Sequence, residues 1–229
     1  MTDQSSNILL YENSVDMEKV KSRRSFIYKA IKRLFDLFGA TIGLIAMVII
    51  VIPVKIMYII TGDFKSVFYT HTRVGKDGVP FLMYKFRTMV PNSKEILEEL
   101  LKDPKYKAEW DKNQKLENDP RVTKAGKILR KTSLDELPQM INVLLGHMSL
   151  IGPRPLIPGE LDKHNGNHEI YERIRPGVTS WWASHGRSAT TYEERLALEY
   201  YYVQNRSLWL DIKCIFATIK AVISKTGAK

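Results

Sequence analysis

The dominant pattern in this chain is a long apolar run near its N-terminus. Residues 34–60 are interrupted by charge only at Asp36 and Lys55. A straight helix of that length measures about 40 Å, whereas the hydrocarbon core of a bilayer is roughly 30 Å thick. The run therefore predicts a membrane-embedded helix that tilts or bends to fit. It begins too far into the chain, and is too long, for a cleaved signal peptide.

Pro53 lies inside this run and predicts the bend. Its ring removes a backbone donor and clashes one turn back, which costs about 3 kcal/mol in a straight helix and is relieved by a kink. Basic residues flank both ends of the run, at 29–33 near its start and at Lys55 and Lys65 near its end. The positive-inside rule therefore gives no reason to place the two ends on opposite sides of the membrane. We therefore expect a re-entrant helix that returns to the cytoplasmic face. An ordinary spanning helix with a late proline is the alternative.

Beyond Gly62 the apolar positions fall into short strands and amphipathic helices. Short apolar runs at 67–69 and 81–84 flank Gly75-Lys76-Asp77-Gly78, whose Asp-Gly pair predicts a β-hairpin. Helical spacing of apolar residues predicts helices over 92–116 with a break at Pro104, over 124–131, over 138–145 and over 209–225.

These elements predict an α+β fold that is mostly helical. We expect an N-terminal re-entrant membrane helix bent at a proline, a small β-hairpin, and amphipathic interfacial helices. The same pattern divides the chain into a mobile polar and basic N-terminal segment (1–25), the membrane-embedded helix (26–62) and a domain on the membrane surface (63–229).

Composition narrows the class of partner. The formal net charge of +10 favours an anionic partner, which could be nucleic acid, an acidic membrane surface or a phosphorylated substrate. Cys214 is the single cysteine, so an intrachain disulfide is excluded and a zinc site is not expected. The five histidines show no metal-ligand spacing.

Two adjacent acids, Asp135 and Glu136, are the first candidate for chemistry. Ser133 followed by Glu136 matches a capping box, which would give both acids a purely structural role. A helix begun at Leu134 would, however, place Pro138 past the first turn, where proline is penalised. We therefore expect the helix to start nearer Pro138, which leaves the side chain of Asp135 free, with an ionised carboxylate.

Arginines in the same half of the chain suit phosphate binding, because an arginine fork donates two hydrogen bonds at once and stays charged. Arg154 lies between Pro153 and Pro155, which fix its backbone before any ligand arrives. Trp181 and Trp182 could stack a nucleobase, although such residues are more often core or membrane-interface anchors. Among these arginines, the candidate phosphate-binding residues are Arg130, Arg154, Arg175 and Arg187.

Several motifs in order resemble the bacterial sugar transferases, the polyprenyl-phosphate hexose-1-phosphate transferases that are also called monotopic phosphoglycosyl transferases. The resemblance covers about residues 32–220, and the short chain resembles the minimal form of the family. The matching motifs are Arg73-Val74-Gly75, Lys85-Phe86-Arg87-Thr88-Met89, Asp119-Pro120-Arg121-Val122-Thr123, 129–139 around Asp135-Glu136, Asn142-Val143-Leu144 and 148–155.

This resemblance implies an enzyme that moves a sugar-1-phosphate from a UDP-sugar to undecaprenyl phosphate and releases UMP. It implies Asp135 as the nucleophile that forms a phosphosugar ester, and Glu136, together with Asp135, as ligand of a divalent metal, Mg²⁺ or Mn²⁺. It adds Lys85 and Arg87 to the candidate phosphate-binding residues. It also implies that residues 63–229 are a catalytic domain around a cytosolic-facing active site. The partners it implies are a lipid bilayer, no nucleic acid and a possible homodimer, and the place is the cytoplasmic face of the bacterial plasma membrane. The product would start a polysaccharide or glycoconjugate.

The chain departs from the family pattern at several positions. Ile52 stands where a serine often precedes the proline, the segment 176–187 has Ser180-Trp181-Trp182 in place of the common Gly-Trp-Ala, and Glu199 replaces a usual aspartate. A reshaped nucleotide or sugar pocket is expected. Two other functions stay open: a membrane-tethered nucleic-acid or lipid-binding module, which would not need the paired acids, and a nucleotide-sugar glycosyltransferase that releases UDP.

Overall fold

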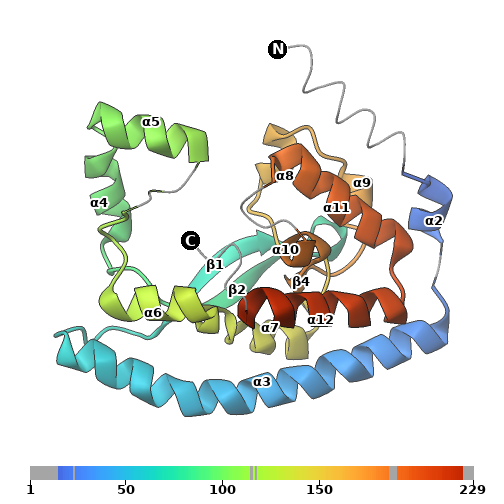
Figure 1. Ribbon diagram of the computed structural model, residues 1–229, viewed down its shortest axis with the longest axis horizontal. Coiled ribbons are helices and arrows are strands. Elements are labelled where there is room, and N and C mark those ends of the chain that lie inside the picture. The colour runs from blue at the N-terminus through green and yellow to red at the C-terminus, as the bar shows by residue number, and fades with distance from the viewer. Residues whose placement is uncertain (1–14, 23, 114–115, 117, 186–189, 224–229) are drawn as a thin grey trace.

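The computed structural model describes residues 15–223, apart from 23, 114, 115, 117 and 186–189. Helices dominate this part of the chain, and the strands form two small pairs (Figure 1). The elements are α2 (Met17–Lys21), α3 (Phe26–Ile60), β1 (Phe68–Val74), η1 (Lys76–Gly78), β2 (Pro80–Phe86), α4 (Ser93–Leu100), α5 (Pro104–Asn113), α6 (Lys124–Thr132), η2 (Leu134–Glu136), α7 (Gln139–Leu145), β3 (Ser149–Ile151), α8 (Glu160–Lys163), α9 (His168–Tyr171), β4 (Gly177–Thr179), α10 (Trp181–His185), α11 (Tyr192–Asn205) and α12 (Leu208–Ile223).

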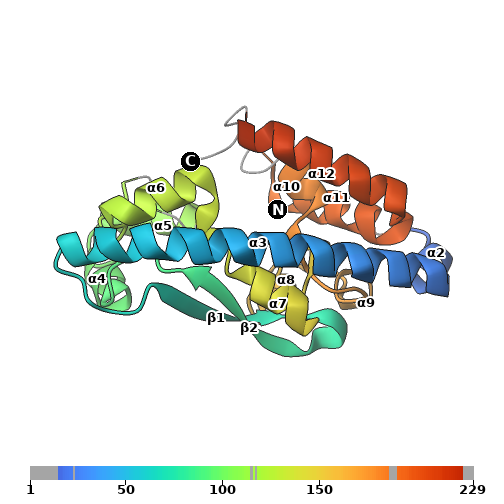
Figure 2. The same ribbon diagram turned by 90° about the horizontal axis from the view of Figure 1, so that it is seen from below.

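Helix α3 forms the base of the molecule. Figure 1 shows it bowed beneath the other elements, and Figure 2, seen from below, shows it across the whole width. It continues through Pro53 as one helix, so the structure shows a gentle curve, and the re-entrant path stays a prediction. Among the described residues, α3 alone is long and apolar enough to cross a membrane by length and composition.

One face of α3 packs against the rest of the protein along nearly its whole length. Its buried residues are Asp36, Ala40, Met47, Val54 and Tyr58. The carboxylate of Asp36 accepts hydrogen bonds from the hydroxyl of Ser149 and the N–H of Leu150, both at 2.9 Å. At the other end Met47, Val54 and Tyr58 share a core cluster with residues of β2 and α6. The domain therefore lies along the helix rather than at one of its ends.

The predicted β-hairpin is confirmed, and its strands are longer than the apolar runs. β1 and β2 pair antiparallel from Phe68 opposite Phe86 to Val74 opposite Pro80. Asp77 and Gly78 both have positive φ, 56° and 76°, which fits the Asp-Gly signal in the turn. The middle of β1 is Thr70-His71-Thr72-Arg73, which has no alternation of apolar and polar residues. Backbone hydrogen bonds pair this part of β1 with β2, and the sequence pattern could not reveal it.

A second, parallel pair was not predicted. β3 and β4 place Ser149 opposite Gly177 and Ile151 opposite Thr179. The two backbones approach so closely that a Cβ on Gly177 would lie 2.1 Å from the nitrogen of Gly152, which explains both glycines. Strands of three residues carry too little periodicity to be recognised in a sequence. This pairing brings the Gly152-Pro153-Arg154-Pro155 loop beside the Pro176-Gly177 turn.

The helix predictions are largely confirmed. Pro104 starts α5 after α4, and the predicted helices over 124–131, 138–145 and 209–225 correspond to α6, α7 and α12. Helices α8 to α11 were not predicted. Within the N-terminal segment that we expected to be mobile, residues 17–21 form α2, because the fully buried Val20 packs in a core cluster with residues of α11.

Candidate active site

The two acids lie on a tight turn between α6 and α7. Ser133 ends α6 in the left-handed conformation with φ of 57°, Asp135 and Glu136 follow in η2, and α7 begins at Gln139 after Pro138 as its N-cap. The side chain of Ser133 makes no capping hydrogen bond in η2, so the alternative capping box is not formed. Both acids therefore precede the helix with side chains that are not used as caps.

Basic side chains from two other elements reach these acids. Lys85, near the end of β2, donates from Nζ to Glu136 Oε1 at 3.0 Å, and both side chains are part exposed, 27% and 40%. Burial raises the pKa of Asp135 above its usual value, while the charges of Lys85 and Arg130 act to lower it. The structure thus brings together Lys85, Arg130, Asp135 and Glu136, which we call the dyad site.

Arg130 is held from the side of β2. It lies in the last turn of α6, and its Nε donates to Thr88 Oγ1 at 3.0 Å. The residue is exposed, so its remaining guanidinium donors can reach a ligand. An exposed, always-charged arginine next to two carboxylates suits a bound diphosphate.

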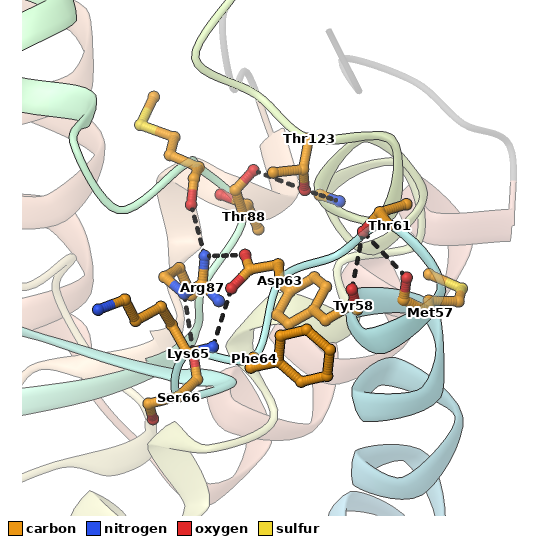
Figure 3. A network of polar contacts seen from close by, with 12 residues as sticks. Met57, Tyr58, Thr61, Asp63, Phe64, Lys65, Ser66, Arg87, Thr88 and Thr123 are labelled. Carbon is orange, nitrogen blue, oxygen red and sulfur yellow. Dashed lines mark hydrogen bonds and ion pairs between the residues drawn. The ribbon is translucent and has the colours of Figure 1, made fainter.

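Arg87 lies only two residues after Lys85, yet its guanidinium is bound elsewhere. It is 9% exposed and pairs with Asp63, which follows the end of α3 (Figure 3). No sequence signal distinguished Arg87 from Lys85, because both belong to the same motif.

Arg154 belongs to a second group of charges. Its backbone N–H donates to Glu199 Oε1 at 3.2 Å, its carbonyl accepts from the Tyr171 hydroxyl at 3.0 Å, and its guanidinium lies 5.8 Å from the centre of the Trp182 ring. Trp182 is thus a packing partner of arginine in this structure. Arg154 makes no ion pair within the described ranges.

The residues around Arg154 were not predicted as a site. Arg195 and Arg73 lie near Glu160, with closest N–O separations of 3.4 Å and 4.0 Å. Burial raises the pKa of the fully buried Glu199 to about 7. We call this group the arginine cluster; it consists of Arg73, Arg154, Glu160, Arg195 and Glu199. Arg73 was visible in the sequence only as part of a family motif, and Arg195 gave no signal.

The two remaining basic candidates are not at the dyad site. Arg175 lies with Arg33 beside Gly146, at the C-terminal end of α7, whereas the acids precede its N-terminal end. Since α7 has seven residues, these ends are about 10 Å apart. Arg187 falls outside the described residues.

The acids fit a hard divalent cation only with help from a substrate. No group of three or more His, Cys, Asp or Glu residues gathers within the parts of the chain that the structure describes. Mg²⁺ is commonly held by one or two carboxylates together with substrate phosphates and waters. Asp135 and Glu136 match that donor set, whereas a closed zinc site would need more protein ligands.

Comparison with known proteins places the chain in a family. The model for "Bacterial sugar transferase" matches residues 27–225. The chain belongs to the bacterial sugar transferase family. This confirms the resemblance that the motifs indicated, and the matched region contains α3 from its second residue onward, the dyad site and the arginine cluster.

Similar proteins come from several bacteria. The chain is 46% identical to a UDP-galactose-lipid carrier transferase of Erwinia amylovora and 45% to an undecaprenyl-phosphate galactose phosphotransferase of Salmonella typhimurium, with 86% of this chain and 41% of each relative covered. It is 42% identical to the exopolysaccharide production protein ExoY of Rhizobium meliloti, with 86% and 87% covered. The chain thus spans less than half the length of the first two relatives and most of the third.

Proposed function

We propose that this protein transfers a sugar-1-phosphate from a UDP-sugar to undecaprenyl phosphate and releases UMP. The observation that supports this is the dyad site, in which two carboxylates on an uncapped turn meet Lys85 and Arg130. Relatives named for UDP-galactose and for undecaprenyl phosphate indicate the two substrates. The same names support a phosphoglycosyl transferase and a role in polysaccharide assembly.

The chemistry is a double displacement at phosphorus. A carboxylate oxygen of Asp135 attacks the sugar-bearing phosphorus, the bond from that phosphorus to the bridging oxygen breaks, and UMP leaves with the electron pair. A phosphate oxygen of the lipid then attacks the same phosphorus and displaces the carboxylate. The sugar-1-phosphate ends on the lipid as a diphosphate, and Asp135 is regenerated without net uptake of a proton.

The basic residues supply charge where the reaction needs it. A diphosphate resists attack by a carboxylate because both are anionic, so Lys85 and Arg130 lower the barrier by neutralising the phosphate oxygens. A Mg²⁺ or Mn²⁺ ion held by Glu136 and Asp135 would add further positive charge at the same oxygens. Arg154 is held by Glu199 and Tyr171 at its backbone, and its guanidinium is left to bind a more distant part of the nucleotide sugar.

The apolar surface supports a place on a bilayer. Beside α3 runs α12, linked to it by Lys32 Nζ and Asp211 Oδ2 at 3.1 Å (Figure 2). Exposed apolar side chains on the two helices include Phe38, Ile42, Ile45, Ile49, Ile52 and Ile56 on α3 and Trp209, Ile212, Phe216 and Ile219 on α12.

The packing of α3 argues for a shallow position in the membrane. From Asp36 to Tyr58 the packed face measures about 33 Å, close to the thickness of the hydrocarbon core. If α3 crossed the bilayer upright, the domain packed along it would be drawn in with its charged groups, which is costly. Both ends of α3 are therefore proposed to face the cytoplasm, where nucleotide sugars are available. The expected homodimer stays a prediction.

The released nucleotide tests the function. Purified protein in detergent or nanodiscs is incubated with Mg²⁺, undecaprenyl phosphate and UDP-galactose, UDP-glucose or UDP-N-acetylhexosamines in turn. We expect UMP and a lipid-linked sugar diphosphate from at least one donor. Release of UDP would support a glycosyltransferase instead, and the absence of turnover with steep salt-dependent binding of a nucleic-acid duplex would support the binding module.

The placement of α3 is tested by labelling. Single cysteines at Lys21 and Lys65 in a Cys214→Ser background should both react with a membrane-impermeant reagent only from the cytoplasmic side. The sequence assigns the bend to Pro53, so in Pro53→Leu the apolar helix, about 40 Å long from residue 34, should tend to span the bilayer and move residue 21 across. A residue 21 that stays cytoplasmic in this variant would mean that the packing of the domain along α3, and not the proline, keeps the helix shallow. Labelling of wild-type position 21 from outside would show an ordinary transmembrane span.

A further inference from the structure

We propose that Arg87 is a positioning residue. Together with Asp63 it holds the end of the membrane helix against the strand that places Lys85 at the dyad. This proposal rests on the proposed function, and it changes the role that the sequence indicated for Arg87, which was contact with phosphate.

The guanidinium of Arg87 is already bound by the protein. Its Nη1 lies 2.7 Å from Asp63 Oδ2 and donates to the carbonyl of Met89 at 3.2 Å, and its Nε donates to the carbonyl of Ser66 at 2.8 Å (Figure 3). The hydrogen bond from Arg87 lowers the pKa of Asp63 below its usual value. The pair is therefore charged on both sides and mutually neutralised.

The ring of Tyr58 covers another side of the Arg87 guanidinium. Its guanidinium carbon lies 4.7 Å from the centre of the ring of Tyr58, which is 1% exposed in the last turns of α3. The Nη2 atom is buried and has no hydrogen-bond partner among the residues that the structure describes. A phosphate would have to displace the carboxylate of Asp63 before it could reach this guanidinium.

An open hollow beside the pair of Arg87 and Asp63 also argues against a phosphate contact for Arg87. It has a volume of about 570 Å³, and Asp63 contributes to its wall whereas Arg87 does not. An anion that entered this hollow would meet a carboxylate before it met the arginine. The lining residues are Gly62, Asp63, Phe64, Lys65, Val90, Pro91 and Asn92.

The strand end next to Arg87 contacts the dyad site at two points. Lys85, two residues before it, binds Glu136, and Thr88, one residue after it, accepts from Nε of Arg130. The carbonyl of Thr88 also accepts from the N–H of Thr123, and a Cβ on Gly126 would lie 2.0 Å from that oxygen. A shift of this strand end would therefore move both cations of the dyad site.

The contacts thus form a chain from the membrane helix to the reacting groups. Tyr58 and Asp63 hold Arg87, Arg87 fixes the strand end, and Lys85 reaches Glu136. Since one substrate is lipid-borne, the height of the dyad above the bilayer must match the lipid phosphate. Arg87 and Asp63 are the charged pair through which the end of α3 contacts the dyad strand, by which we mean the end of β2 that carries Lys85.

A double-mutant cycle tests the proposal. Asp63→Asn removes the charge of the partner, and Arg87→Lys keeps the positive charge but cannot bond Asp63, Ser66 and Met89 together. We expect each single variant to lower kcat by about 10- to 100-fold, with KM for the UDP-sugar changed by less than about threefold. The double variant should be no slower than the slower single variant, because both changes break one contact.

A phosphate contact predicts a different pattern. In that case Asp63→Asn would free Arg87 and leave activity equal to or above that of the wild type, whereas Arg87→Lys would raise KM. That combination would overturn the proposal. Additive losses in the double variant would overturn it as well, since they would mean that the two residues act independently.

Amide hydrogen exchange gives a readout beyond activity. In Asp63→Asn we expect faster exchange at 61–66, at 85–89 and also at 134–137, where the dyad lies. A local structural role would leave 134–137 unchanged and so contradict the proposal. Lys32→Met is the matched control, because it breaks another ion pair between α3 and the domain, Lys32 with Asp211 at 3.1 Å, away from the dyad strand.

Folding and the proposed function are separated by two further controls. Thermal melting of each variant shows whether it is folded at the assay temperature, and Lys32→Met should keep kcat within about twofold of wild type. If the wild type itself released no UMP, the proposed function would fail. The exchange at 134–137 would still decide whether Arg87 and Asp63 place the dyad turn.

Discussion

The dyad site and the arginine cluster contain the same kinds of residue and use them differently. In the dyad site the ion pair of Lys85 and Glu136 is part exposed, at 27% and 40% of the side-chain surface. In the arginine cluster Arg195 and Glu160 are 7% and 14% exposed, and Glu199 is fully buried. One group is open to solvent, and the other is packed among Tyr171, Trp182 and Tyr192.

This difference in burial indicates which group can rearrange around a ligand and which group stabilises the fold. An exposed pair contributes little to stability, so Lys85 can exchange Glu136 for a phosphate at small cost. A buried charge that loses its partner is strongly destabilising, so Arg195 and Glu160 are fixed. The cluster therefore holds the Arg154 loop in place, and the dyad site is free to rearrange around a ligand. Variants in the two regions should accordingly separate activity from stability.

The largest effect is expected at Asp135, the proposed nucleophile. Asp135→Asn should lower turnover by about 10³-fold or more, because the amide cannot form the phosphosugar ester. Its melting temperature should stay close to that of the wild type, since the amide keeps the shape and relieves a partly buried charge. Coupled detection of UMP, together with thermal melting, measures both quantities.

Mass spectrometry of the wild type sharpens this result. With UDP-sugar and no lipid, a phosphohexose adduct should appear on Asp135 after rapid quenching, and Asp135→Asn should show none. Persistent absence of the adduct would favour direct transfer in a ternary complex. Near-normal activity of the variant would remove Asp135 from the nucleophilic role.

Much of the dyad site could be predicted from sequence, because its signals are local. Pro138 could not lie inside a helix, so Asp135 and Glu136 had to precede one, and η2 with α7 beginning at Gln139 agrees. The Asp-Gly turn and the apolar length of α3 were local signals as well. The arginines near the acids included Arg130, and the family motif added Lys85; the structure brings both to the acids.

The arginine cluster could not be predicted, because it depends on pairing between distant segments. Arg73 on β1, Glu160 on α8 and Arg195 on α11 meet only after the hairpin and the parallel strands β3 and β4 have formed. Those three-residue strands have no detectable period. Arg87 shows the same limit, because Asp63 lies 24 residues before it and nothing in the motif separates a buried arginine from an exposed one.

The second largest effect is expected in the arginine cluster. Arg195→Met should lower the free energy of unfolding by about 3 to 5 kcal/mol, because it leaves Glu160 without its closer arginine and removes the cation between Trp182 and Tyr192. Denaturant unfolding measures this loss. Lys85→Met is the matched control in the dyad site: it should lower activity while unfolding changes by less than about 1 kcal/mol.

The contrast between the dyad site and the arginine cluster would be wrong if Arg195→Met lost activity but not stability, or if Lys85→Met lost stability. An Arg195→Met protein of normal stability with abolished turnover would place Arg195 itself, and not only Arg154, in direct contact with substrate. A strongly destabilised Lys85→Met protein would mean that the dyad site is itself part of the scaffold. Both measurements are made at one pH and salt concentration, because exposed pairs are screened by salt.

The smallest effect concerns Glu199 and the pH dependence of stability. Burial raises the pKa of Glu199 to about 7, above its value of 4.5 in an unfolded chain, so between these values the folded protein holds a proton that the unfolded chain has released. Its contribution to stability is present below pH 4.5 and is lost as pH rises through about 7.

Glu199→Gln stays neutral, and its carbonyl oxygen can still accept from the N–H of Arg154. The stability of the variant relative to wild type should therefore rise by about 2 to 3 kcal/mol between pH 5 and pH 8. Unfolding curves of both proteins at four pH values measure this difference, in which the other titrating groups cancel. Parallel pH profiles would show that Glu199 is ionised throughout, and the arginine cluster would then be a charged site like the dyad site.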